Sequence, residues 1–208
     1  MALKVKVCGI TNEKDALLAS SLGAWALGFV FYKQSPRFIS PSRAQKIIQA
    51  LPPFVTPVGI FVNQKEGAVK SIADFCGLGA LQLHGDETPL YCSRLRQYKI
   101  IKAFRVKEDF DISNCSQFKV SAYLFDAYDE KDYGGSGKTF NWDVIKDKKF
   151  ARPVILSGGL TPENIAEAAR AVSSYAVDVS SGVEKSPGQK DGKLLQDFFS
   201  AIGFACQK

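Results

Sequence analysis

Residues 154–160 read VILSGGL and residues 177–184 read VDVSSGVE. In both stretches a short aliphatic or β-branched run, typical of a buried strand, stops at a cluster of small residues. Such turns leave backbone N–H groups accessible, which is what a phosphate group requires. Two of them in succession near the end of a chain of β/α repeats are typical of the loops after strands 7 and 8 of a (β/α)₈ barrel. The predicted phosphate-binding residues are Gly158, Gly159, Ser180, Ser181 and Gly182.

The rest of the chain alternates short apolar runs with longer amphipathic stretches in the same way. Predicted strands begin near Val5, Ala26, Val55, Ala80, Ile100, Ala122, Val154 and Tyr175. Amphipathic helices are predicted over residues 12–22, 42–51, 65–76, 88–97, 162–172 and 193–202. This alternation favours a closed parallel TIM barrel, with a doubly wound open sheet as the competing arrangement. No linker divides the chain, so a single domain over residues 1–208 is expected.

The composition indicates a globular protein that acts on small anionic molecules. Of the 208 residues, 46% are hydrophobic and 23% are charged, and no apolar run approaches the ~20 residues that cross a bilayer. The start of the chain lacks the apolar core of a signal peptide, which predicts a cytoplasmic location without membrane contact. The net charge of +6 is scattered, whereas nucleic-acid binding requires clustered basic residues. The surplus is therefore interpreted as attraction for anionic metabolites.

Cysteine and histidine usage argues against disulfides and against a metal centre. The five cysteines are dispersed without any C-x-x-C spacing, as expected for reduced thiols. His84 is the only histidine of the sequence, and transition-metal sites need several such ligands at short spacing. No metal and no cofactor are expected.

Active sites of parallel barrels lie at the carboxyl ends of the strands. Cys8 follows the first predicted strand and has two interpretations: a nucleophile or base, or a small buried hydrophobe. Asp126 closes the sixth strand and is either a general acid or a cap or salt-bridge partner for the following loop. Arg37 lies in the loop after the second strand, where its guanidinium fork suits a carboxylate, unless it is a solvated loop arginine. Further polar residues at strand ends are Asn63, Gln82, His84, Arg105 and Asp178.

Gln82, His84 and Asp178 are secondary candidates, because a lone histidine is more often structural than catalytic.

Residues 134–139 read GGSGKT and contain a Gly-Lys-Thr triplet. The spacing of a nucleotide-binding P-loop would require a further glycine at Asp132, so the segment is interpreted as a mobile lid.

Taken together, the motifs resemble one family, phosphoribosylanthranilate isomerase of tryptophan biosynthesis. The matching stretches lie in the order of that family over nearly the whole chain: KVCGIT at 6–11, SPR at 35–37, GIFVN at 59–63, QLHGDE at 82–87, LFD at 124–126, GGSG at 134–137, LSGGL at 156–160 and DVSSGVE at 178–184. Each stretch alone is weak, and the set is specific.

The resemblance implies an Amadori rearrangement of N-(5-phosphoribosyl)anthranilate that needs neither a metal nor a redox cofactor. It assigns the general base to Cys8, the general acid to Asp126 and the grip on the anthranilate carboxylate to Arg37. The phosphate would lie on the two small-residue turns. The expected partner is this small phosphorylated substrate, and the chain is expected to be a monomer or a homodimer.

Three alternatives stay open at this point. Another phosphosugar isomerase or epimerase would typically recruit a metal and several histidines. A two-substrate isomerase of histidine and tryptophan synthesis is expected to use a pair of aspartates. A catalytically inactive phosphate-binding barrel would not need Cys8, Asp126 and Arg37.

Overall fold

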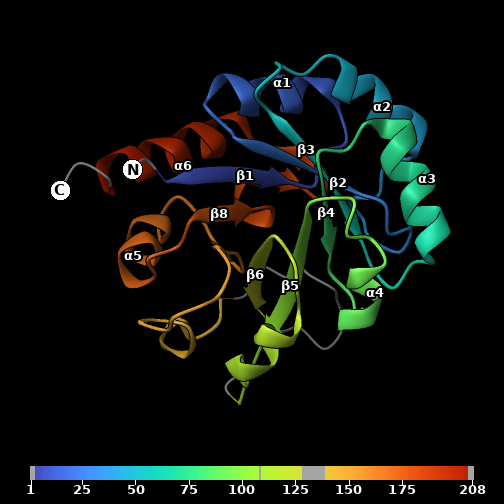
Figure 1. Ribbon diagram of the computed structural model, residues 1–208. Coiled ribbons are helices and arrows are strands. Elements are labelled where there is room, and N and C mark those ends of the chain that lie inside the picture. Colours follow the sequence, from blue (N-terminus) through green and yellow to red (C-terminus); the bar gives the residue numbers. More distant parts are fainter. Residues whose placement is uncertain (1–2, 108, 128–138, 206–208) are drawn as a thin grey trace.

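The computed structural model describes residues 3–107, 109–127 and 139–205, and it contains a closed barrel of parallel strands in chain order (Figure 1). The barrel closes because β8 pairs with β1 as well as with β7. This confirms the predicted TIM barrel and shows that the open-sheet alternative was wrong. The strands are β1 (Lys4–Cys8), β2 (Ala26–Val30), β3 (Thr56–Phe61), β4 (Ala80–Leu83), β5 (Ile100–Val106), β6 (Ala122–Ala127), β7 (Val154–Leu156) and β8 (Ala176–Val179).

Helices surround the barrel, and side-chain caps set where several of them begin (Figure 1). Asn12, Ser40 and Thr88 each accept a hydrogen bond from a first-turn backbone N–H, which satisfies a donor that the helix leaves free. The helices are α1 (Glu13–Ser21), α2 (Pro41–Gln49), α3 (Glu66–Cys76), α4 (Pro89–Ser93), α5 (Ile165–Ala171) and α6 (Gly192–Ala205). Within the described residues, no helix combines the length and the apolar character that a membrane span needs.

Two predicted helices are longer in the sequence pattern than in the structure. The helix predicted over 88–97 ends at Ser93, because the next N–H groups bond to carbonyls three residues earlier and form tight turns. The helix predicted from residue 162 begins at Ile165, because the Asn164 side chain accepts from Thr161 N and holds a turn there. Short 3₁₀ helices lie at η1 (Ile112–Gln117), η2 (Trp142–Val144) and η3 (Ser181–Val183), and a hairpin of β9 (Glu184–Ser186) and β10 (Gln189–Lys190) follows β8.

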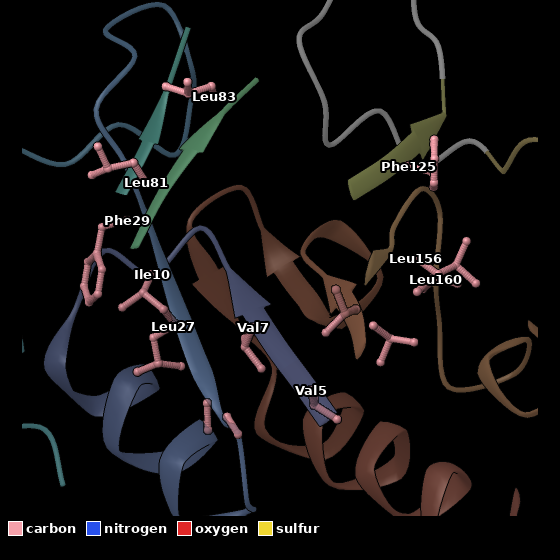
Figure 2. Packing of buried hydrophobic residues seen from close by; sticks show 14 of the residues in the cluster. Val5, Val7, Ile10, Leu27, Phe29, Leu81, Leu83, Phe125, Leu156 and Leu160 are labelled. Carbon is pink, nitrogen blue, oxygen red and sulfur yellow. The ribbon is translucent and has the colours of Figure 1, made fainter. Parts of the chain in front are cut away.

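Strand residues alternate between two environments, as the pleat requires. One set packs outward against the helices and forms the main core, for example Val5, Val7 and Leu27 (Figure 2). The other set faces the barrel interior, which has an apolar layer of Ala103, Ala122, Leu124, Ile155 and Ala176. Nearer the carboxyl ends of the strands, the interior side chains that line the site described below are polar at Gln82, Asp126 and Asp178 and apolar at Cys8, Val30 and Ile60.

Candidate active site

A cleft lies at the carboxyl ends of the barrel strands and contains about 510 Å³ of empty space, counting the part open to solvent. Its position is the one that parallel barrels use for ligands. The cleft brings together most of the predicted site residues, which come from β1, β2, β4, β6, β8 and the loops that follow them. Its lining comprises Cys8, Val30, Tyr32, Ser35, Arg37, Ile60, Val62, Gln82, His84, Asp126, Ser157, Asp178 and Ser180.

Cys8 is the last residue of β1, and a glycine on the neighbouring strand makes room for it. Gly28 is paired with Cys8 in the register of β1 and β2. A Cβ atom at Gly28 would lie 2.7 Å from Cys8 Sγ, which is closer than such atoms approach each other, and 3.0 Å from Cys8 Cα, which is a tight contact. The position of the thiol in the cleft therefore depends on Gly28.

A buried ion pair lies beneath the thiol. Lys6 and Asp178 are opposite each other in the register of β1 and β8, and Lys6 Nζ donates to Asp178 Oδ2 at 2.7 Å. Burial acts against the charge on Lys6, but the Asp178 carboxylate and the Cys8 sulfur outweigh it and raise the pKa of Lys6. Burial also raises the pKa of the Cys8 thiol, and the positive charge of Lys6 opposes this shift. Lys6 is thus the main group that favours a Cys8 thiolate.

Asp126 lies near the carboxyl end of β6, and its side chain lines the cleft. The residue is 4% exposed, so it is almost withdrawn from solvent. Its Oδ1 accepts a hydrogen bond from the Ala127 N–H at 2.9 Å, and its Oδ2 lies 3.1 Å from His84 Nε2. On the other side of the ring, His84 Nδ1 lies 2.8 Å from the side-chain nitrogen Nε2 of Gln82. His84 is therefore enclosed between Gln82 and the Asp126 carboxyl group.

Arg37 reaches the cleft with one edge of its guanidinium already engaged. Its Nε lies 3.1 Å from both carboxylate oxygens of Glu184, and its Nη2 donates to Glu184 Oε2 at 2.7 Å. A substrate carboxylate would therefore meet the outer edge formed by Nη1 and Nη2. Gly9 permits this approach, because its φ of +81° favours glycine and a Cβ there would lie 2.7 Å from Arg37 Cδ.

The two small-residue turns lie against each other. A Cβ atom at Gly182 would come within 1.9 Å of the Leu160 carbonyl oxygen, so only glycine fits between the turns. Gly158 and Gly159 have φ values of +89° and +58°, in the left-handed region. Within the described part of the chain, no acceptor is found for the backbone N–H groups of Gly158, Gly159, Ser181 and Gly182. The turns thus offer the free N–H groups that an anion requires.

The predicted residues divide into two groups. Cys8, Arg37, Gln82, His84, Asp126, Asp178 and Ser180 line the cleft, whereas Gly158, Gly159, Ser181 and Gly182 form the adjoining turns. Asn63 and Arg105 instead contact Asp86 in the loop after β4. The expected lid at residues 134–137 lies outside the described residues.

Sequence reasoning missed three charged residues of the site: Lys6, Glu184 and Lys190. A detectable signal existed for Lys6, because a lysine between two valines of a buried strand must find an acidic partner. Glu184 was noted only as part of a motif, and its contacts with Arg37 and with Lys190 Nζ follow from the hairpin after β8.

Comparisons with known proteins agree on one family. The model of the family "N-(5'phosphoribosyl)anthranilate (PRA) isomerase" matches residues 5–201. N-(5'-phosphoribosyl)anthranilate isomerase of Geotalea uraniireducens is 53% identical over 196 residues, covering 94% of this chain and 96% of the relative. The crystal structure of phosphoribosyl anthranilate isomerase from Thermus thermophilus superposes with a TM-score of 0.89 at 36% identity, covering 97% of this chain and 99% of that one. A further structure of such an isomerase, in complex with reduced 1-(o-carboxyphenylamino)-1-deoxyribulose 5-phosphate, has a TM-score of 0.85 at 39% identity, again covering 97% of this chain and 99% of the other.

Proposed function

This chain belongs to the phosphoribosylanthranilate isomerase family, and from that premise we propose how its residues carry out the reaction. The chain is an isomerase of tryptophan biosynthesis that converts N-(5-phosphoribosyl)anthranilate into 1-(2-carboxyphenylamino)-1-deoxyribulose 5-phosphate. The observation that carries the assignment of roles is that Cys8, Asp126 and Arg37 line one cleft beside the two small-residue turns. Substrate binding and proton transfer then have separate residues.

The two ends of the substrate are held by different parts of the cleft. The phosphate accepts hydrogen bonds from the free N–H groups around Gly158, Gly159 and Gly182 and from the Ser180 and Ser181 region. The anthranilate carboxylate accepts from the outer edge of Arg37. With both ends fixed, the ribose lies between them, next to the proton-transferring groups.

The chemistry requires one acid and one base. Asp126 donates a proton to the furanose ring oxygen; the C1′–O bond breaks and the nitrogen lone pair forms a C=N bond, giving an iminium ion. Cys8, as the thiolate, then removes the C2′ proton, which the adjacent C=N makes acidic, and the electron pair forms the enolamine. Protonation at C1′ and loss of the hydroxyl proton at C2′ give the ketone. Each positioned proton transfer contributes about 10²–10⁴-fold to the rate.

The supporting residues act on these two groups. Lys6 stabilises the thiolate of Cys8, and Asp178 holds Lys6 in place by the 2.7 Å ion pair. His84 lies beside Asp126 and positions its carboxyl group.

We also propose that the chain works on this small metabolite in the cytoplasm, as a monomer or a homodimer.

The role of Arg37 is tested by steady-state kinetics of the Arg37→Met variant. We expect KM to rise about 10- to 100-fold with a smaller change in kcat, because a charge-assisted contact with the substrate is lost while the acid and base remain. Arg94→Met is a matched control, since Arg94 also pairs with a glutamate, Glu66, but with a side chain that is 58% exposed. An unchanged KM for Arg37→Met would show that the carboxylate binds elsewhere.

A further inference from the structure

Lys190, at the end of the hairpin strand β10, has a charged side chain with no exposed surface. No step of the proposed reaction uses it. Its ammonium donates to the carbonyl oxygen of Cys8, to the carbonyl oxygen of Ser180 at 3.1 Å and to Glu184 Oε1 at 2.8 Å. These acceptors belong to the proposed base at the end of β1, to the phosphate turn after β8 and to the carboxylate that holds Arg37. One buried charge therefore connects the three working parts of the site.

The charges around Arg37 show why Lys190 matters for binding. Three contacts, of Nε with both carboxylate oxygens and of Nη2 with Oε2, join Arg37 to Glu184, so this pair taken alone is neutral. Lys6 and Asp178 form a second neutral pair. With Lys190 included, the group of Arg37, Glu184 and Lys190 carries one net positive charge. An incoming carboxylate is stabilised by that net charge, because the wall of the cleft has a lower dielectric constant than water.

The location of this charge is maintained by its surroundings. Burial lowers the pKa of Lys190, and the Glu184 carboxylate opposes this change. Glu184 is itself fixed, since its Oε1 also accepts from the Gly188 N–H at 3.2 Å. The hairpin that carries Lys190 is joined to the loop after β1 by the hydrogen bond from Thr11 Oγ1 to the Gly188 carbonyl oxygen. Lys190 thus belongs to a hairpin that is hydrogen-bonded to the loop after β1 and to Glu184.

We propose that Lys190 is a positioning residue of the isomerase: it supplies the net positive charge that lets Arg37 bind the substrate carboxylate despite its pairing with Glu184, and it fixes the Cys8 and Ser180 loops relative to each other. This role rests on the proposed function of Arg37. Lys190 acts without touching the substrate, because its side chain is fully enclosed. It therefore affects affinity through charge and geometry, and it is neither the acid nor the base of the reaction.

The Lys190→Met variant removes the charge and keeps most of the side-chain length. We expect calorimetry with anthranilate, the carboxylate end of the substrate, to give a Kd about tenfold higher than that of the unmodified chain. kcat/KM should fall by at least the same factor, and the affinity for inorganic phosphate should also decrease. Lys193→Met is the matched control, since Lys193 is a nearby lysine with an 81% exposed side chain, and it should leave these values unchanged.

A double variant, Lys190→Met with Glu184→Gln, separates charge from structure. It lacks every Lys190 hydrogen bond but restores one net positive charge, on Arg37, so we expect it to bind anthranilate more tightly than Lys190→Met. A purely structural role predicts no recovery. If Lys190→Met does not fold, the double variant is compared with the unmodified chain and should lie within about threefold of it in Kd for anthranilate.

Two results would overturn the proposal: a Lys190→Met variant within about twofold of the unmodified chain in anthranilate affinity, or a double variant that binds anthranilate no better than Lys190→Met. In the fallback comparison, a double variant outside the threefold range would have the same meaning. Failure of the proposed function would look different. In that case Arg37→Met would leave anthranilate binding unchanged, whatever the Lys190 variants do.

Discussion

The Asp126→Asn variant is expected to lose almost all turnover and to keep its affinity for the reduced product analogue. Asparagine has nearly the same shape, and its side-chain oxygen can still accept from the Ala127 N–H, which Asp126 Oδ1 does at 2.9 Å. It has no acidic proton to give to the ring oxygen, so the iminium ion does not form. The expected loss in kcat is about 10²–10⁴-fold, the usual contribution of a positioned acid.

Single-turnover kinetics at saturating substrate measure this loss, and calorimetry with the analogue measures binding. Asp86→Asn serves as the control, because Asp86 lies at the same end of the barrel in an exposed pair with Arg105, with 60% of the Asp86 side chain accessible. A near-normal kcat in Asp126→Asn would mean that another group protonates the ring oxygen.

The Cys8→Ala variant is the second change with a large expected effect. Its kcat should fall by about 10²–10⁴-fold, because alanine leaves no group to remove the C2′ proton. Cys115→Ala is the matched control: Cys115 is also buried and free, burial raises its pKa to about 12, and it does not line the cleft.

The pH dependence gives Cys8 a signature that loss of stability cannot reproduce. In the proposed mechanism the base is the Cys8 thiolate and the acid is protonated Asp126, so the active form requires both states at once. Burial raises the pKa of Cys8, and the pH profile of kcat/KM of the unmodified chain should therefore contain an ionisation on the alkaline side of neutrality. The residual activity of Cys8→Ala should lack this ionisation. If Cys8→Ala retained it, the ionisation would belong to another residue.

The position of the site could be predicted because it depends on a simple repeat. Strand starts at βα spacing place Cys8 and Asp126 at carboxyl ends of strands, and the closed barrel brings both to one cleft. The glycines of the two turns could also be identified in the sequence. The structure shows why they are glycines, since the positive φ of Gly158 and the contact of Gly182 with Leu160 both exclude larger residues. These features are local in sequence, so a single chain reveals them.

The charged network could not be predicted in the same way, because it depends on strand register. Lys6 stands between valines and so does Asp178, but only the pairing of β1 with β8 shows that these two charges meet. Glu184 and Lys190 depend on a hairpin at a stretch of proline, glycine and polar residues that carries no strand periodicity. The end of α4 at Ser93 could not be predicted either. Its amphipathic pattern continues beyond Ser93, where the backbone forms tight turns instead of a helix.

A crystal structure of the chain with the reduced analogue would test the central claim most directly, namely that Cys8 and Asp126 act on a substrate held between Arg37 and the two small-residue turns. We predict the phosphate on the turns at Gly158-Gly159 and Ser181-Gly182, and the carboxylate on Arg37. Cys8 Sγ should then lie within about 4 Å of the carbon that corresponds to C2′, with the Asp126 carboxyl group next to the oxygen of the former ring. A reversed ligand, or a Cys8 sulfur out of contact with that carbon, would contradict the account.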